Sequence, residues 1–334
     1  MAGHVTVVPG TLTAIRRPCR LLVPVFLAML ALAALAPGAQ AVTIRYPTLS
    51  SGNRGSDVKA VQATLIGLGY RLTYDGIYGT TTVNAVKSFQ AAHALAVTGI
   101  VDDGTWNRLL VPIGPGSVGM PVRVLQRELI EKRHAKIPVD SVYGASTKAA
   151  VIAFQKHMGL TATGSVTLQT WRYLLWHYET PAFNATTLCD YSVGNGAANW
   201  ATGSSIGALE ATAAAVAAKG YGRIAVGDAS LEHGGNIPGH QTHEVGLDID
   251  IRLLRKDHQQ CRYGTTYRLS TYDRNATRAL IRAIRAAAPG HVKLIYFNDP
   301  VLIAQGLTTH FPGHDDHLHI RYCVPGYTDP MYRC

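Results

Sequence analysis

The C-terminal part of the chain contains the alternating run Leu247-Asp248-Ile249-Asp250-Ile251. Side chains on a β-strand point to opposite faces in turn, so this run predicts a strand with its apolar residues in the core and both aspartates on the other face. Another strand is predicted by the run His317-Leu318-His319-Ile320-Arg321-Tyr322, in which two histidines and an arginine share one face. If the two strands are neighbours in one sheet, two carboxylates and two imidazoles lie on a common surface.

The segment around these runs combines helices with strands. Apolar periodicity predicts helices over residues 205–219 and 275–288 and strands over residues 223–226, 247–251, 291–297 and 317–322. Gly220 and Pro289-Gly290 follow the two helices and are expected to end them. Because strands and helices do not alternate regularly, we expect an α+β fold.

Histidines precede both strands that carry the alternating runs. The first strand follows the loop Gly239-His240-Gln241-Thr242-His243, and the second follows Gly313-His314-Asp315-Asp316. Histidine and aspartate at a loop-to-strand junction, joined by a histidine from a distant strand, form a three-ligand set typical of catalytic zinc sites, whose open position activates water. Spacing alone leaves open whether Asp248 or Asp250 is the ligand. Each strand taken by itself could also be an ordinary solvated face.

Residues 54–175 contain an internal repeat with an offset of 64 or 65 residues. The repeated elements are Gly-x-x-Val from Gly55 and Gly119, Gln62 and Gln126, Asp-x-x-Tyr-Gly ending at Gly79 and Gly144, Phe-Gln at 89–90 and 154–155, and Trp106 and Trp171. Each copy predicts three short helices around an apolar and aromatic core. Each copy also resembles the three-helix peptidoglycan-binding domain, although Ser141 of the second copy replaces a turn glycine.

The first 41 residues have the features of an export signal. Arg16, Arg17 and Arg20 precede an apolar run over residues 21–35, and Ala39-Gln40-Ala41 fits a small-x-small cleavage site. We expect a cleaved signal peptide, no stable membrane insertion afterwards, and a secreted or periplasmic chain associated with the cell wall. An uncleaved anchor is the alternative, but the apolar run is short for a membrane span.

Charge and cysteine content fit export. The formal net charge is +10, and three arginines of the signal account for part of it, which leaves +7 for the remainder. A positive chain favours an anionic polymer such as the bacterial wall, and export argues against nucleic acid. After residue 41 an even number of cysteines predicts two disulfides, with three possible pairings. These cysteines are Cys189, Cys261, Cys323 and Cys334.

The C-terminal histidine motifs together resemble the penicillin-insensitive murein endopeptidase family of LAS-type zinc peptidases. The resemblance rests on Gly239-His240-x-x-His243-x-x-Gly246-Leu247-Asp248-x-Asp250 and on Gly313-His314-Asp315-Asp316-His317-x-His319. It implies that His243, Asp250 and His319 bind Zn²⁺ and that His240 is a further candidate ligand. It also implies His314 as the general base and His317 as a hydrogen-bond donor to the hydrated carbonyl.

Two details refine the resemblance. No glutamate occurs between Gln305 and His319, which favours the branch with a histidine base over the carboxypeptidase branch. No histidine follows Asp273 at the family's spacing, so a second, accessory metal is not expected there. Elsewhere, Glu232-His233 is expected to be a solvated pair on a loop, and His258 and His291 are expected to be structural or exposed.

These observations predict the organisation of the whole chain. We expect a signal peptide over 1–41, peptidoglycan-binding domains over 50–111 and 116–177, and a zinc peptidase domain over 185–334, with a linker over 179–187. The expected function is a zinc-dependent endopeptidase that hydrolyses D-alanyl amide bonds in peptidoglycan cross-links, tethered by its binding domains. The alternatives are a D,D-carboxypeptidase acting on uncross-linked stem peptides, a non-catalytic wall-binding protein and a metal-sequestering protein. The oligomeric state is not predicted.

Overall fold

The computed structural model describes residues 44–192 and 198–334. The predicted signal peptide over 1–41 lies outside the described residues. In the part of the chain that is described, no helix is both long enough and apolar enough to cross a membrane.

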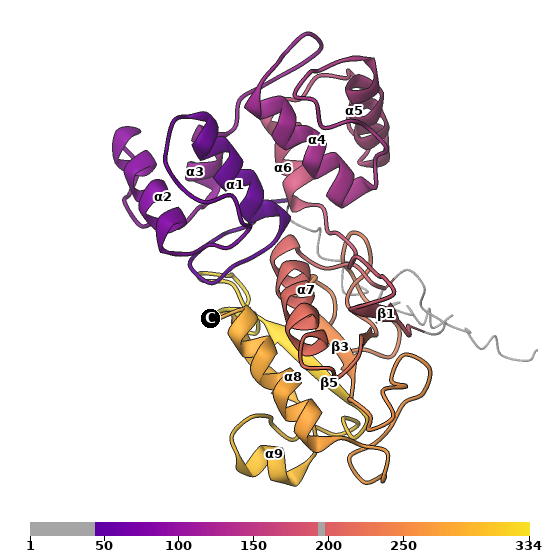
Figure 1. Ribbon diagram of the computed structural model, residues 1–334. Coiled ribbons are helices and arrows are strands. Elements are labelled where there is room, and N and C mark those ends of the chain that lie inside the picture. The colour runs from indigo at the N-terminus through magenta and orange to yellow at the C-terminus, as the bar shows by residue number, and fades with distance from the viewer. Residues whose placement is uncertain (1–43, 193–197) are drawn as a thin grey trace, which may run out of the picture. The chain divides into compact units, whose positions relative to one another are not determined.

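The internal repeat folds as two sets of three helices (Figure 1). The first set is α1 (Ser56–Gly67), α2 (Thr80–Ala92) and α3 (Asp103–Leu109), and the second is α4 (Met120–Arg133), α5 (Ala145–His157) and α6 (Leu168–Trp176). The apolar stripes that predicted the helices are buried in one continuous core. The sequence prediction of three short helices in each copy is therefore confirmed.

The repeated polar residues hold the two copies in the same conformation. The side-chain amide of Gln62 donates to Asp75 Oδ1 over 2.8 Å, and that of Gln126 donates to Asp140 Oδ1 over 2.7 Å. In the turn that follows, Ser141 adopts a φ of 65°, in the left-handed region that usually favours glycine. These motif residues therefore stabilise loops within each copy.

The repeated aromatic residues are also structural. The hydroxyl groups of Tyr78 and Tyr143 each donate to a backbone carbonyl over 2.9 Å, and the indole N–H groups of Trp106 and Trp171 do the same over 2.8 and 2.9 Å. All four side chains are buried with their polar atoms satisfied. They belong to the core, as the sequence predicted.

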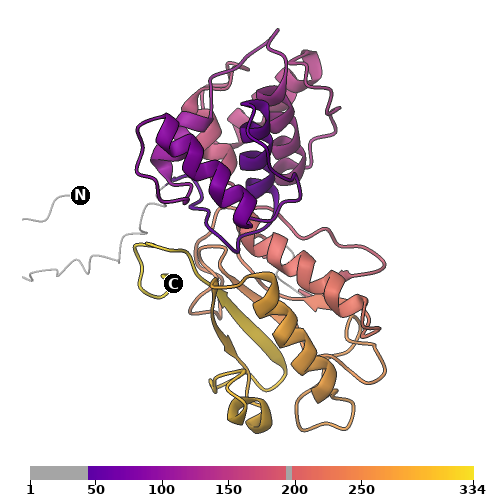
Figure 2. The ribbon, with the colours of Figure 1, turned by 60° about the vertical axis from the view of Figure 1, so that its left-hand side comes forward.

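The C-terminal part is an α+β fold built on a five-stranded sheet of order β1-β2-β3-β5-β4. Its elements are β1 (Leu188–Asp190), α7 (Gly203–Ala217), β2 (Ile224–Val226), β3 (Asp248–Arg252), α8 (Arg274–Ala287), β4 (Val292–Tyr296), α9 (Pro300–Ala304) and β5 (His317–Tyr322). Only β1 and β2 pair in parallel. Helices α7 and α8 lie side by side on one face of the sheet and bury its apolar side chains (Figure 2).

Local signals explain most helix ends. Asp273 is the N-cap of α8, and its carboxylate accepts a hydrogen bond from the backbone N–H of Ala276 over 2.9 Å. Helix α7 already ends before Ala218, and Gly220 adopts a φ of 76° two residues beyond this cap. The backbone N–H of Gly220 donates to the Ala217 carbonyl over 2.9 Å and that of Tyr221 to the Val216 carbonyl over 3.4 Å, so Gly220 ends the helix as predicted. Strand β1 and helix α9 were not predicted, because both are very short.

The prediction of a linker over residues 179–187 is wrong at its start. Glu179 is buried, and its backbone exchanges two hydrogen bonds with Ala201 over 2.9 and 3.0 Å. Its carboxylate accepts from the Ser56 hydroxyl over 2.9 Å. This segment has few apolar residues, yet it is held by polar contacts with residues distant in sequence.

Two disulfides link the four described cysteines. Cys189 is bonded to Cys261, and Cys323 is bonded to Cys334. The first joins β1 to the region after β3, and the second closes the chain segment that follows β5. The structure thereby selects one of the three pairings that the sequence left open.

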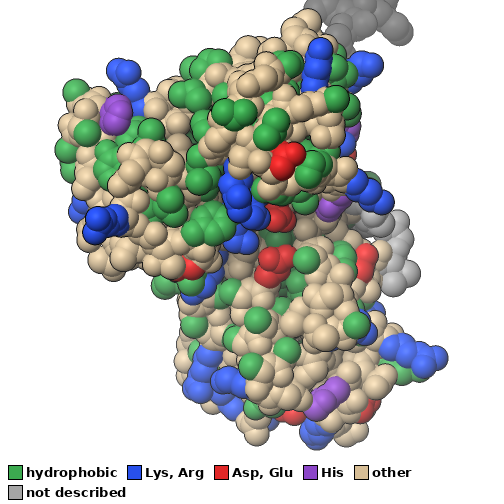
Figure 3. Space-filling view, turned by 45° about the horizontal axis from the view of Figure 1, so that its top comes forward, with side chains coloured by type: hydrophobic (Ala, Val, Ile, Leu, Met, Phe, Trp, Pro, Cys, Tyr) green, Lys and Arg blue, Asp and Glu red, His purple; other side chains and the backbone are tan. Residues whose placement is uncertain are grey.

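The surface charge is dispersed on the face shown in Figure 3. Lysine and arginine side chains there are spread over the surface and do not form one continuous basic patch. The net positive charge therefore does not by itself mark a binding site on this face.

Candidate metal centre

The two alternating strands are neighbours, which is the condition that the sequence left open. Strands β3 and β5 pair antiparallel with Asp250 opposite His319 and Asp248 opposite Arg321. Side chains directly opposite each other on one face lie close together. This register places the imidazole of His319 directly opposite Asp250 and the guanidinium of Arg321 opposite Asp248.

Three side-chain atoms, from His243, Asp250 and His319, converge beside the middle of β3. His243 Nε2 lies 3.1 Å from His319 Nδ1 and 3.4 Å from Asp250 Oδ1, and the latter two atoms are 3.0 Å apart. Zinc holds nitrogen and oxygen ligands at about 2.0–2.2 Å in tetrahedral geometry, which separates two ligand atoms by roughly 3.4 Å. The spacing and the chemistry of these donors therefore fit a zinc ion.

The backbone of His243 is held in an uncommon conformation. Its φ is 74°, in the left-handed region that a residue with a side chain rarely adopts. The ring Nδ1 lies 2.8 Å from the carbonyl oxygen of Ala229, and the backbone N–H donates to Asp248 Oδ2 over 3.3 Å. Because Nδ1–H donates to the carbonyl, the lone pair of Nε2 faces Asp250 and His319.

Asp248 supports the site and is not one of the three converging groups. Its Oδ1 accepts from His319 Nε2 over 2.9 Å and from Arg321 Nε over 2.8 Å, and its Oδ2 accepts from the Tyr332 hydroxyl over 2.6 Å. All of its acceptor sites face buried partners. The alternative of a solvated strand face is wrong here, because Arg321 is buried in this ion pair.

Charge in the cluster is balanced by these contacts. Although burial alone would raise the pKa of Asp250, hydrogen bonds from His243 and His319 lower it. Burial would likewise raise the pKa of Asp248, but its contacts with His319 and Arg321 lower it to about 2. Burial would lower the pKa of His319, and the two aspartates instead raise it to about 9. These contacts thus favour the ionised form of both carboxylates.

His240 lies beside the three-atom cluster but has its own partner. Its Nε2 is 3.0 Å from Asp228 Oδ2, and its ring centroid is 4.6 Å from that of His243. Donor atoms of His240, His243 and Asp250 lie within 4.8 Å of one another. The geometry is compatible with a ligand and also with a group that positions His243.

His314 and His317 lie beside the cluster. Their ring centroids are 4.7 Å apart, and that of His314 is 5.6 Å from His319. His314 Nδ1 contacts the carbonyl oxygen of Pro312 over 3.0 Å, and burial lowers the pKa of this histidine. His317 Nδ1 is 2.7 Å from Asp316 Oδ1, and its Nε2 is 4.0 Å from Asp250 Oδ2. Every histidine predicted for the site therefore lies in one region.

The sequence reasoning missed the residues that surround these histidines. Tyr296 on β4 lies opposite His319, and its ring stacks on Phe311 with centroids 4.6 Å apart and meets His314 edge to face at 5.4 Å. Tyr332, which anchors Asp248, comes from the segment closed by the second disulfide. The alternation of the predicted strand 291–297 could have placed Tyr296, but only if its pairing partner were known.

Glu232 and His233 lie on a loop, as predicted, and are partly exposed, but they are not a freely solvated pair. The Glu232 carboxylate forms an ion pair with Arg133 and lies 3.2 Å from His157 Nε2. The contacts come from a distant segment, so no local signal revealed them. The prediction for the other two histidines is confirmed, because His291 is buried against backbone carbonyls and His258 is exposed.

Comparisons with known families match the two helical repeats and part of the α+β segment separately. Residues 54–109 and 119–174 each match the family described as a peptidoglycan binding domain. Residues 194–296 match the penicillin-insensitive murein endopeptidase family. The matched segment contains His243 and Asp250 but ends before His314.

Individual relatives match over shorter parts. An N-acetylmuramoyl-L-alanine amidase of Bacillus licheniformis is 32% identical over 35% of this chain and 42% of its own length. A zinc D-Ala-D-Ala carboxypeptidase of Streptomyces albus G is 38% identical over 19% of this chain and 26% of its own length. This chain therefore spans less than half of either relative.

A solved structure gives a similarly partial match. The fused Zn-dependent amidase/peptidase/peptidoglycan-binding domain-containing protein of Clostridium acetobutylicum is 31% identical, with 27% of this chain and 43% of that chain covered. The TM-score is 0.19, which is too low for a conclusion about the fold.

Proposed function

Because this chain carries two peptidoglycan-binding domains followed by a penicillin-insensitive murein endopeptidase domain, we propose that it hydrolyses peptide cross-links in bacterial peptidoglycan. The observation that carries the proposal is the convergence of His243 Nε2, Asp250 Oδ1 and His319 Nδ1 within 3.0–3.4 Å. A zinc ion held by these atoms would supply Lewis acidity at the carbonyl of the bond to be cleaved.

The other ring nitrogen of each proposed histidine ligand makes a contact that supports this assignment. His243 donates its other ring N–H to a backbone carbonyl, and His319 donates its own to Asp248. Such contacts fix the tautomer and the orientation of metal-binding histidines. We propose that His240, which is held by its contact with Asp228, packs against His243 and helps to position it without binding the metal.

His314 is the proposed general base. Its Nδ1–H donates to the Pro312 carbonyl, so Nε2 carries the lone pair that can take a proton from the attacking water. The same atom can then return the proton to the leaving amine. Partial burial lowers the pKa of this ring, which keeps it neutral and ready to accept a proton.

His317 is the proposed donor to the carbonyl oxygen. Asp316 holds its Nδ1 over 2.7 Å, which leaves Nε2 facing the site. A hydrogen bond from this atom would strengthen as negative charge develops on the oxygen during attack.

The proposed place of action is the cell wall outside the membrane. The two disulfides are typical of an oxidising compartment, and two peptidoglycan-binding domains would keep the active site close to its substrate.

A D,D-carboxypeptidase that removes a terminal D-Ala is the second candidate. The match to a zinc D-Ala-D-Ala carboxypeptidase favours it, although that match covers only 19% of this chain. The two functions are separated by comparing a purified D,D-cross-linked muropeptide dimer with an uncross-linked pentapeptide. We expect kcat/KM to be higher for the dimer, and a clear preference for the pentapeptide would select the carboxypeptidase.

A further inference from the structure

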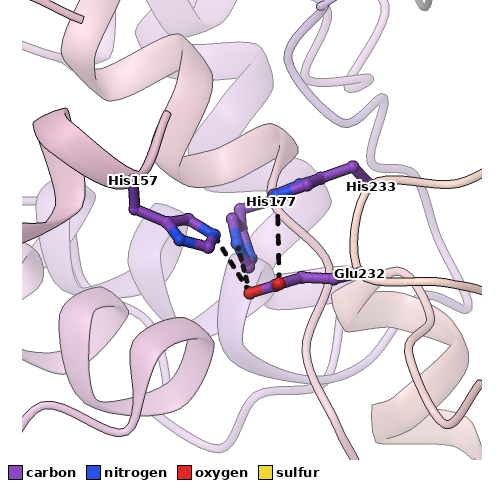
Figure 4. Close-up of side chains that lie close together, drawn as sticks. All are labelled: His157, His177, Glu232 and His233. Atoms are coloured by element: carbon purple, nitrogen blue, oxygen red, sulfur yellow. Dashed lines mark ion pairs between the residues drawn. The ribbon is translucent and has the colours of Figure 1, made fainter. Parts of the chain in front are cut away.

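A second cluster of histidines and a carboxylate lies away from the candidate metal centre. Figure 4 shows the side chains of His157, His177, Glu232 and His233 directed toward one another. His157 ends α5 and His177 follows α6, both in the second helical repeat. Glu232 and His233 belong to the loop between β2 and β3. The cluster therefore joins two segments that are distant in sequence.

The donor atoms are close enough for one ion. Glu232 Oε1 lies 3.2 Å from His157 Nε2 and 3.4 Å from His177 Nε2, and Glu232 Oε2 lies 3.9 Å from His233 Nε2. One donor atom from each residue lies within 4.8 Å of all the others. Three imidazoles and one carboxylate are a complete ligand set for Zn²⁺ or a similar divalent transition metal.

The His177 ring is already oriented for such a role. His177 Nδ1 lies 2.6 Å from the Tyr178 carbonyl oxygen, to which it donates, so the lone pair of Nε2 faces Glu232. His177 has no exposed surface, which fixes this orientation. In His233 the Nε2 atom faces Glu232 Oε2 over 3.9 Å.

Arg133 also contacts this cluster. Its guanidinium group forms an ion pair with Glu232 Oε1 and lies 3.2 Å from His177 Nε2. These are the two atoms that a metal ion would share. Because the Arg133 side chain is 23% exposed, it can extend into solvent when a cation of higher charge takes its place.

The first helical repeat lacks these histidines. At the offset of 65 residues, His157 and His177 correspond to Ala92 and Pro112. Helices α2 and α5 each end at the matching position, so the correspondence is structural as well. The histidines are therefore not required by the three-helix fold.

We propose that His157, His177, Glu232 and His233 form a second site for Zn²⁺ or a similar divalent transition metal, which clamps the loop between β2 and β3 to the second helical repeat. The same loop supplies Ala229, whose carbonyl orients His243, and Gly235, whose N–H donates to the Glu244 carbonyl over 2.9 Å. An ion at the second site would thus order the segment that leads into the candidate metal centre. The proposal does not depend on the peptidase function.

The test uses the full chain with the first centre disabled by His243→Ala. Zinc content is measured by plasma mass spectrometry after equilibrium dialysis, and Co²⁺ affinity by its visible absorption. We expect one Zn²⁺ per chain in this background and loss of that ion when His157→Ala or His233→Ala is added. His93→Ala is the matched control, because His93 is an exposed helix-end histidine of the first repeat, and it should leave the ion bound.

Removal of the Arg133 guanidinium gives a second test, which leaves all four proposed ligands in place. Arg133→Gln should tighten Co²⁺ binding by about tenfold or more, since the guanidinium no longer competes for Glu232 and His177. Hydrogen exchange of residues 228–242 should slow when zinc is added. The proposal is overturned if the His243→Ala chain binds no metal, if His157→Ala and His233→Ala leave binding unchanged, or if Arg133→Gln fails to tighten it. Unchanged exchange with metal bound would overturn the clamp.

Discussion

Asp248 accepts a hydrogen bond from His319 Nε2 over 2.9 Å, and the opposite ring nitrogen of His319 therefore faces Asp250 and His243. Asp248, which precedes the proposed ligand Asp250 by two residues, thus selects which ring nitrogen of His319 faces the proposed ion. The two aspartates on this strand face therefore have different proposed roles. Asp250 faces the proposed ion, and Asp248 orients His319.

Replacement of Asp248 by asparagine should weaken metal binding without removing a ligand. The amide cannot supply the charge that balances Arg321 and orients His319, and loss of such a supporting contact typically costs 10–100-fold in affinity. Zinc affinity measured by competition with a chromogenic chelator checks this. Asp257→Asn is the control, because the exposed Asp257 carboxylate pairs with Arg255 and not with a histidine of the site, so affinity should stay unchanged. An unchanged affinity in Asp248→Asn would contradict the assigned role.

Replacement of His314 by alanine should reduce kcat while zinc remains bound. Loss of a general base typically lowers the rate by about 10²–10⁴-fold, and His314 is not one of the three proposed ligands. The measurements are muropeptide turnover and zinc content on the same sample. His310→Ala, at an exposed histidine nearby, should behave as the unmodified chain. If zinc is lost together with activity, His314 is a ligand and the assignment of the base is wrong.

Replacement of His240 by alanine separates the two roles compatible with its position. Because its Nε2 already contacts Asp228, we expect the variant to retain one equivalent of zinc in the first centre with reduced affinity. Zinc titration of a chain that also carries His157→Ala, which removes the second proposed site, isolates this effect. Complete loss of zinc would show that His240 is a ligand.

Acid should destabilise the metal-free chain partly through His177. Burial lowers the pKa of His177 to about 3, so the folded state holds this ring neutral. The resulting stabilisation is fully present above the ordinary pKa of about 6.5 and is lost as the pH falls toward 3, by up to about 1.4 kcal/mol per unit. Urea unfolding in chelator at pH 7, 5.5 and 4.5 should show a steeper loss than in His177→Gln. Parallel pH profiles of the two chains would refute this prediction.

Strand alternation was sufficient to predict much of the candidate site. A period of two is a local property, and it correctly grouped Asp248 with Asp250 and His317 with His319. It could not choose between the two aspartates, because that choice depends on the register with β5 and on Tyr332, which lies 84 residues along the chain. The family resemblance pointed to Asp250, and the converging distances support that residue as the proposed ligand.

The predictions for Glu179 and Glu232 failed for the same physical reason. Glu179 and Glu232 each stand in short polar stretches that locally indicate solvated loops. Their carboxylates instead meet Ser56 and Arg133, which lie 123 and 99 residues away in the sequence. Polar contacts of this kind leave no periodic pattern, whereas the apolar stripes of the helical repeats do. The disulfide pairing was undetermined for the same reason.

Anomalous scattering from zinc-loaded crystals, recorded on either side of the zinc absorption edge, tests the central claim most directly. The account predicts a peak about 2.0–2.2 Å from His243 Nε2, Asp250 Oδ1 and His319 Nδ1. It also predicts that the peak disappears in His319→Ala. A zinc ion bound through Asp248, or no peak at this position in a preparation whose activity requires zinc, would contradict it.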